Sequence, residues 1–189
     1  MRTGSNFRSG AYAGGELAFA STSGHVREPF GSAGLGSEGV AGGVFAGYAL
    51  HVGAFQIAAQ VLAQISTIGS SAIATAAGTY NQVGINNMVA LSILPGVIIG
   101  HNALAFIQLG VASAHFSATL PGITHISTHL TGILFGMGLQ AHVAGCISVR
   151  GEFVHGSFAS VTRTVAGVRQ TFSPQSNQFG AQLLCQFSA

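Results

Sequence analysis

The stretch GVAGGVFAGYALHVGAFQIAAQVLAQIST (residues 39–67) begins the segment that decides how this chain can fold. Residues 39–149, which are 111 consecutive positions, contain no Lys, Arg, Asp or Glu. Soluble domains contain about one quarter charged residues, which keep their surface in contact with water. A segment this long without charge is expected to be surrounded by lipid. The chain is therefore predicted to be an integral membrane protein.

The composition of the chain indicates how the membrane domain is built. The chain is 48% hydrophobic, has 28 Gly and contains no Trp. Membrane helices use small residues to bring their backbones close together, because lipid supplies no hydrophobic driving force between helices. We therefore predict an all-α integral membrane fold.

The charged residues divide the chain into three parts. Residues 1–37 are rich in Gly, Ser and Ala and are predicted to form an irregular extramembrane arm. Residues 38–149 are the predicted transmembrane domain, and residues 150–189 an irregular extramembrane tail. Arg150 and Glu152 would mark the exit into water. The net charge of +2, without a basic run, argues against a nucleic-acid partner.

Three transmembrane helices fit within residues 38–149. A helix crosses the bilayer core with about 20 apolar residues. Residues 39–67, 86–120 and 123–149 are each long enough. Pro95 and Gly96 interrupt the second of these stretches, and either a kink or two separate segments would accommodate them.

Side chains suited to catalysis or to disulfide bonding are scarce. The chain has no Asp, and its four Glu lie outside residues 39–149, so that segment holds no paired-carboxylate site. An enzyme could therefore be at most an electron-transfer subunit, and enzymatic activity stays undecided. Two cysteines do not make a disulfide framework, and Cys146 is expected to be a small buried residue.

Histidines are the richest chemical feature of the uncharged segment. Six of the eight lie within it: His51, His101, His115, His125, His129 and His142. Ionisable side chains inside a membrane usually have a function. Neutral imidazole is also a good axial ligand for the metal of a tetrapyrrole. The alternative is that each histidine only hydrogen-bonds a neighbouring helix.

The spacing of four histidines predicts two facing pairs. His101 and His115 are 14 residues apart, and His129 and His142 are 13 apart. If the chain reverses at Pro121 and Gly122, His115 comes to the height of His129. His101 then comes to the height of His142. Each pair could hold one haem between two helices.

These segments resemble the haem-bearing helices of di-haem b-type cytochromes. The resemblance rests on HNALAFIQLGVASAH (residues 101–115) and HLTGILFGMGLQAH (residues 129–142), since those cytochromes carry two widely spaced histidines on each of two helices. The histidine pattern is also similar to that of photosystem core antenna helices, which bind chlorophyll. The resemblances imply haem b or chlorophyll as the cofactor, with these ligands: His51, His101, His115, His129 and His142.

Two further lines of residues recur every fourth position. They are Gly39, Gly43, Gly47 and His51, followed by Gln56, Gln60 and Gln64. Residues at this spacing share one face of a helix. The glycine line could pack against another helix or a flat ligand. The glutamine line could hydrogen-bond a neighbouring helix, or face a partner subunit, a quinone or a water-filled path.

The favoured function is that of a membrane subunit in a respiratory or photosynthetic complex. It would hold a tetrapyrrole for electron or excitation transfer, beside other membrane subunits, in an organelle inner or thylakoid membrane. One alternative is a cofactor-free structural subunit of such a complex. Another is a self-assembling shell or fibre protein of β-structure, whose faces are buried against copies of itself.

Overall fold

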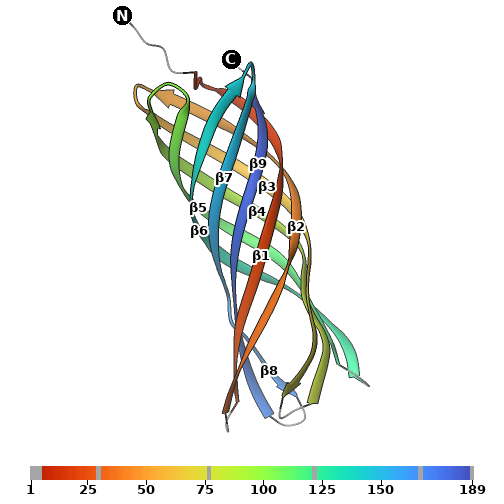
Figure 1. The fold of residues 1–189 in the computed structure, drawn as a ribbon. Coiled ribbons are helices and arrows are strands. Elements are labelled where there is room, and N and C mark those ends of the chain that lie inside the picture. The colour runs from red at the N-terminus through yellow and green to blue at the C-terminus, as the bar shows by residue number, and fades with distance from the viewer. Residues whose placement is uncertain (1–5, 29–30, 76–77, 121–122, 166–167, 188–189) are drawn as a thin grey trace, which may run out of the picture.

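The structure, a computed structural model, consists almost entirely of β-strands joined by short connections (Figure 1). It describes residues 6–28, 31–75, 78–120, 123–165 and 168–187. In these ranges the strands are β1 (Gly10–Glu28), β2 (Gly31–Val52), β3 (Phe55–Thr75), β4 (Gly78–Ile99), β5 (Ala103–Leu120), β6 (Ile123–Ala144), β7 (Ile147–Phe158), β8 (Val161–Val165) and β9 (Val168–Gln186).

The strands form one closed antiparallel barrel. Consecutive strands pair from β1 to β7, β7 pairs with β9, and β9 pairs with β1 to close the ring. The short strand β8 pairs with the first part of β9, and β7 pairs with the rest. Strands β7 and β8 therefore act as one interrupted strand, and the ring has eight positions. Figure 1 shows the strands winding obliquely around a common axis.

The prediction of an all-α fold with three transmembrane helices is wrong. Residues 39–67, expected as the first helix, belong to β2 and β3, and the expected irregular arms contribute β1 and β7 to β9. Across the described ranges, no helix is long and apolar enough to span a membrane. Within lipid, both a helix and a closed barrel can pair all of their backbone N–H and C=O groups, and this chain forms a closed barrel.

Alternation of side chains explains why these residues form strands. In β3 the inward residues are buried, and they include Gln56, Gln60 and Gln64. The residues between them point outward and include the exposed Ile57 and Val61. Successive strand residues face opposite sides of a sheet, and β-branched residues favour strands. Residues four apart share a face in a strand as well as in a helix, so the glutamine line did not distinguish the two.

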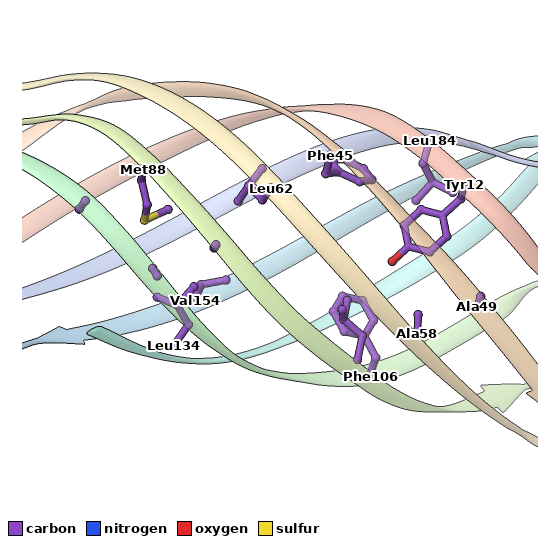
Figure 2. Packing of buried hydrophobic residues seen from close by; sticks show 14 of the residues in the cluster. Tyr12, Phe45, Ala49, Ala58, Leu62, Met88, Phe106, Leu134, Val154 and Leu184 are labelled. Carbon is purple, nitrogen blue, oxygen red and sulfur yellow. The ribbon is translucent and has the colours of Figure 1, made fainter. Parts of the chain in front are cut away.

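Inward glycines make room for large side chains inside the narrow barrel. A Cβ added at the glycine would collide with the ring lying over it in four cases: Tyr12 over Gly47, Phe45 over Gly14, Phe106 over Gly138 and Phe158 over Gly132. Small barrels often alternate small and large inward residues so that the interior is filled. Figure 2 shows the large inward side chains lying within the ring of strands. This packing explains the glycines at these four positions.

Tight turns join the strands at the end of the barrel where β1 starts and β9 ends. Gly53 follows β2 and has φ 65°, and Gly145 follows β6 and has φ 59°. Such left-handed backbone is readily adopted by glycine and suits two-residue hairpin turns. We call this end the short-turn end after the turns at Gly53, Gly100 and Gly145, although the connections at the other end, such as that between Glu28 and Gly31, are equally short.

A disulfide joins Cys146, in the β6–β7 turn, to Cys185 of β9, with a Cα–Cα distance of 4.7 Å. The backbone N–H of Gln186 also donates to the carbonyl oxygen of Cys146 at 2.8 Å. The expectation that Cys146 is a small buried residue is wrong, since its side chain is exposed. Disulfides persist in oxidising compartments, which include the bacterial periplasm and cell surface.

Adding a methyl group inside the barrel should destabilise it. A Cβ at Gly138 would lie 2.6 Å from the carbonyl oxygen of Gly151 and against the ring of Phe106. Gly138→Ala should therefore lower the free energy of unfolding by about 1–3 kcal/mol, because overpacking forces the backbone to shift. Urea unfolding of the refolded barrel would measure the change.

Gly151→Ala provides the matched control, because a Cβ there would meet nothing within 4 Å. Its effect should stay within about 0.5 kcal/mol. Equal losses of stability in the two variants would show that inward packing does not explain the role of Gly138.

Candidate functional site

The outward side chains form an apolar belt around the barrel. Large exposed hydrophobic residues recur between residues 55 and 65 of β3, 89 and 99 of β4, and 133 and 143 of β6. A tilted strand crosses the hydrocarbon core with about 9–11 residues, which matches these lengths. So large an exposed apolar surface needs lipid rather than water around it. The chain is an integral membrane protein, as its uncharged segment predicted, but strands make the crossing.

The belt covers only part of each long strand. Strands β2, β4 and β6 have 22 residues each, and the belt lies in the part next to the short-turn end. The sequence of the other part is small and polar, as in GSAGLGSEG (residues 31–39) and GTYNQ (residues 78–82). Among the side chains whose exposure is described, the belt therefore ends near Val40 in β2, Val89 in β4 and Ile133 in β6.

Pro95 is neither a helix kink nor a helix end. It lies within β4 opposite Ile57 of β3, and the pairing of β4 with β5 omits Leu94 and Pro95. Proline lacks the N–H that a ladder needs. An apolar depression of about 520 Å³ lies at this interruption, and its lining includes Leu50, Val52, Phe55, Ile57, Val97 and Ile107.

Arg150 of β7 is the centre of a polar network inside the barrel. Its guanidinium donates to Oε1 of Gln60 at 2.8 Å, of Gln140 at 2.9 and 3.2 Å, and of Gln182 at 3.1 Å. Gln60 belongs to β3, which is four positions from β7 in either direction around the ring. The side chains of Arg150 and Gln60 therefore meet across the lumen from opposite walls of the barrel. Three aromatic rings surround the guanidinium carbon at 5.0–5.7 Å, those of Tyr12, Phe45 and Phe106.

Two buried carboxyl groups extend this network. Glu16 of β1 accepts hydrogen bonds from Gln64 at 2.8 Å and from Gln182 at 2.6 Å. Glu152 of β7 is 5% exposed, and its Oε2 atom has no hydrogen-bond partner in the described part of the chain. Both acids flank Gly180, where a Cβ would lie 3.6 Å from Glu152 Cγ and 3.7 Å from Glu16 Cδ. We call Arg150, Glu16, Glu152 and their bonded glutamines the lumen network.

The segment before β1 crosses the lumen at the short-turn end. The backbone N–H of Asn6 donates to the carbonyl oxygen of His101 at 3.1 Å, and its side chain donates to Asn102 Oδ1 at 2.5 Å. Both acceptors lie in the β4–β5 turn, on the opposite side of the ring from β1. Phe7 is buried, with 3% of its side chain exposed. Residues 6–9 therefore form a mouth strap over this end of the lumen.

Three of the predicted histidine ligands lie at the short-turn end. The backbone N–H of His51, at the end of β2, donates to Ser9 Oγ of the mouth strap at 2.9 Å. His101 is exposed in the β4–β5 turn. The backbone N–H of His142, on β6, donates to the carbonyl oxygen of Asn102 at 2.8 Å. His101 and His142 are thus close in the fold, but they lie on a turn and a strand.

The other predicted pair lies beyond the belt. His115 of β5 stands directly opposite His129 of β6, and their ring centroids are 4.9 Å apart. Both residues have the outward parity of their strands. The side chain of His125 falls outside the part for which surroundings are described.

The predicted haem or chlorophyll cofactor is wrong. The helices that would have held a macrocycle between them are replaced by strands. Buried side chains occupy the described part of the lumen, and the described residues contain no group of three or more His, Cys, Asp or Glu suited to a metal ion.

Sequence reasoning missed the lumen network because it treated charge as a marker of water. Arg150 and Glu152 were interpreted as the exit from the membrane, and Glu16 as part of an extramembrane arm. The sequence does contain a pattern that indicates the network. Arg150 and Glu152 alternate with the outward residues Val149, Gly151 and Phe153. In a strand this spacing places both charges on one face.

No protein-family model and no curated protein matches the chain. Among solved structures it is similar to Neisserial surface protein A, with 11% identity, coverage of 92% of this chain and 97% of that chain, and a TM-score of 0.52. It is also similar to Ail, the attachment invasion locus protein of Yersinia pestis (9% identity, 92% and 99% coverage, TM-score 0.44). A third similar structure is the N-terminal β-barrel domain of Pseudomonas aeruginosa OprF (10% identity, coverage of 86% of this chain and 96% of that chain, TM-score 0.41).

The similarity to the Neisserial protein supports the barrel fold, and the other two structures, whose TM-scores are below 0.5, are not used to support it. The barrel fold shows that the resemblance to cytochrome and antenna helices is wrong. The favoured function in a bioenergetic complex, which depended on those helices, is wrong as well.

A charge placed in the belt should destabilise the protein according to its depth. Met137, on the outward face of β6, is exposed within the belt, and Thr131 lies on the same face at its edge. Met137→Arg should cost about 2–4 kcal/mol and Thr131→Arg about 0–1 kcal/mol. Reversible unfolding from phospholipid bilayers would measure both. Equal costs at the two positions would contradict the placement of the bilayer.

Proposed function

We propose that this chain is an outer-membrane β-barrel protein with a closed lumen, which acts as a binding module at the cell surface. The observation that carries the proposal is the hydrogen bond from Arg150 to Gln60, because it joins opposite walls of the barrel. A protein built to pass solutes would need a water-filled path at that place.

Two features support a closed lumen. An eight-stranded barrel has an interior just wide enough for side chains to fill. Here the lumen network occupies the interior at the level of the belt, and the mouth strap crosses the short-turn end. A solute would have to displace both.

The outer membrane is the location that this architecture favours. Outer-membrane barrels have an outward apolar band, a polar interior and an even number of antiparallel strands, and all three features occur here. The disulfide between Cys146 and Cys185 is in keeping with an oxidising compartment. An organelle inner or thylakoid membrane, as first expected, would instead call for helices.

A binding role is supported by the length of the strands beyond the belt. The belt begins at Val40 in β2 and at Ile133 in β6, and we propose that the residues before it in each strand present their surface to water. Loops and strand ends carried by a rigid scaffold are common positions for recognition. In place of the expected partner subunits, we propose a ligand in the aqueous medium outside the cell.

Conductance across planar bilayers tests the closed lumen. The wild-type protein should show no steady conductance, because the bonds of Arg150 block the lumen. Arg150→Ala in a chain that also lacks residues 1–9 should open a measurable ion path, because both the guanidinium and the mouth strap are then removed. The chain that lacks residues 1–9 but keeps Arg150 is the control and should remain closed, because the bonds of Arg150 still cross the lumen.

Far-ultraviolet circular dichroism would establish that each variant is folded. Steady conductance of the wild-type protein at the level of Arg150→Ala would overturn the proposal that the lumen is closed.

A further inference from the structure

We propose that His115 and His129, together with Asn87, form a surface site for a divalent transition-metal ion such as Cu²⁺, Ni²⁺ or Zn²⁺. The site would bind the ion directly through imidazole nitrogens, without a tetrapyrrole. It lies beyond the apolar belt, on the side away from the short-turn end. It is separate from the lumen network and independent of whether the lumen is closed.

The three side chains stand in one row across three neighbouring strands. In the β4–β5 pairing Asn87 is opposite His115, and in the β5–β6 pairing His115 is opposite His129. All three have the outward parity of their strands. The two imidazole centroids are 4.9 Å apart, with an angle of 66° between the ring planes. Side chains directly opposite on adjacent strands are close enough to share a ligand.

The sheet is irregular at this row. The register of β4 against β5 shifts between Ile85 and Asn87. An irregularity of this kind re-aims the side chains beside it, and bulges are over-represented next to functional sites. The register shift therefore provides a second reason to consider Asn87 part of the site.

Both imidazoles are available to a ligand. His129 is exposed and His115 is half-buried. Within the described part of the chain, the imidazole rings of His115 and His129 contact each other, and no hydrogen bond from either ring to another described residue is found. His155, also on the outer face, differs because its Nδ1 atom lies 2.8 Å from Asn177 Oδ1 and is occupied.

The donor set determines which ions would bind. Imidazole nitrogen suits Zn, Cu and Ni, whereas Ca²⁺ and Mg²⁺ prefer carboxylate and carbonyl oxygens. Two imidazoles and one amide oxygen would supply three ligands, and water would complete the coordination. A bound ion would link β5 to β6 where the barrel leaves the bilayer.

A Cu²⁺ titration of the refolded, untagged protein in detergent micelles tests this site. Calorimetry should detect one tight equivalent of Cu²⁺, and electron paramagnetic resonance should show coupling to two nitrogen ligands. His115→Ala and His129→Ala should each weaken binding by at least about tenfold, since even loss of an outer-shell partner costs about 10–100-fold in metal affinity.

His101→Ala is the matched control, because this exposed histidine lies at the opposite end of the barrel. It should bind Cu²⁺ as the wild type does, and circular dichroism should confirm that all variants are folded. Absence of binding, binding retained in the His115→Ala, His129→Ala double variant, or binding lost in His101→Ala would overturn the site. An unchanged affinity in Asn87→Ala would overturn the assignment of the amide as third ligand.

Discussion

Closure of β1 on β9 is the constraint on which the rest of this structure depends. In hydrocarbon, no water is present to hydrogen-bond the N–H and C=O groups of an unpaired edge strand. Each unsatisfied group would raise the free energy of the folded protein by roughly 2–7 kcal/mol. The pairing from Tyr12 with Gln186 to Arg27 with Thr171 removes both edges at once. Once the ring is closed, each strand has one face toward lipid and one toward the lumen, which separates the belt from the lumen network.

The small interior then determines which side chains can face inward. Phe45 and Phe106 fit because glycines of neighbouring strands leave space for them. A buried charge is costly unless it is hydrogen-bonded, and Arg150 meets this condition through three glutamines. The same side chains that satisfy the charge also fill the lumen. Stability of the interior and the proposed closure of the lumen would therefore have a common cause.

The helical interpretation failed for reasons that particular residues make clear. Gln56, Gln60 and Gln64 recur every fourth position, and this spacing places them on one face of a strand as readily as of a helix. His115 and His129 do lie opposite each other, but on paired strands and not on facing helices, because chain reversal sets such residues side by side in an antiparallel pair of either kind. The outward Ile57, Val61 and Ile65 held the missing information, since their alternation with the glutamines is a strand pattern.

The sequence by itself determined that lipid surrounds the centre of the chain, because ionised side chains are costly in hydrocarbon and residues 39–149 have none. Only the tertiary structure decided which charged residues lie inside. Glu16 shares Gln182 with Arg150, and these two bonds join residues 166 and 32 positions apart in the chain. The cysteines likewise meet across a separation of 39 residues. No local pattern encodes such contacts, because an inside exists only after the first strand has paired with the last.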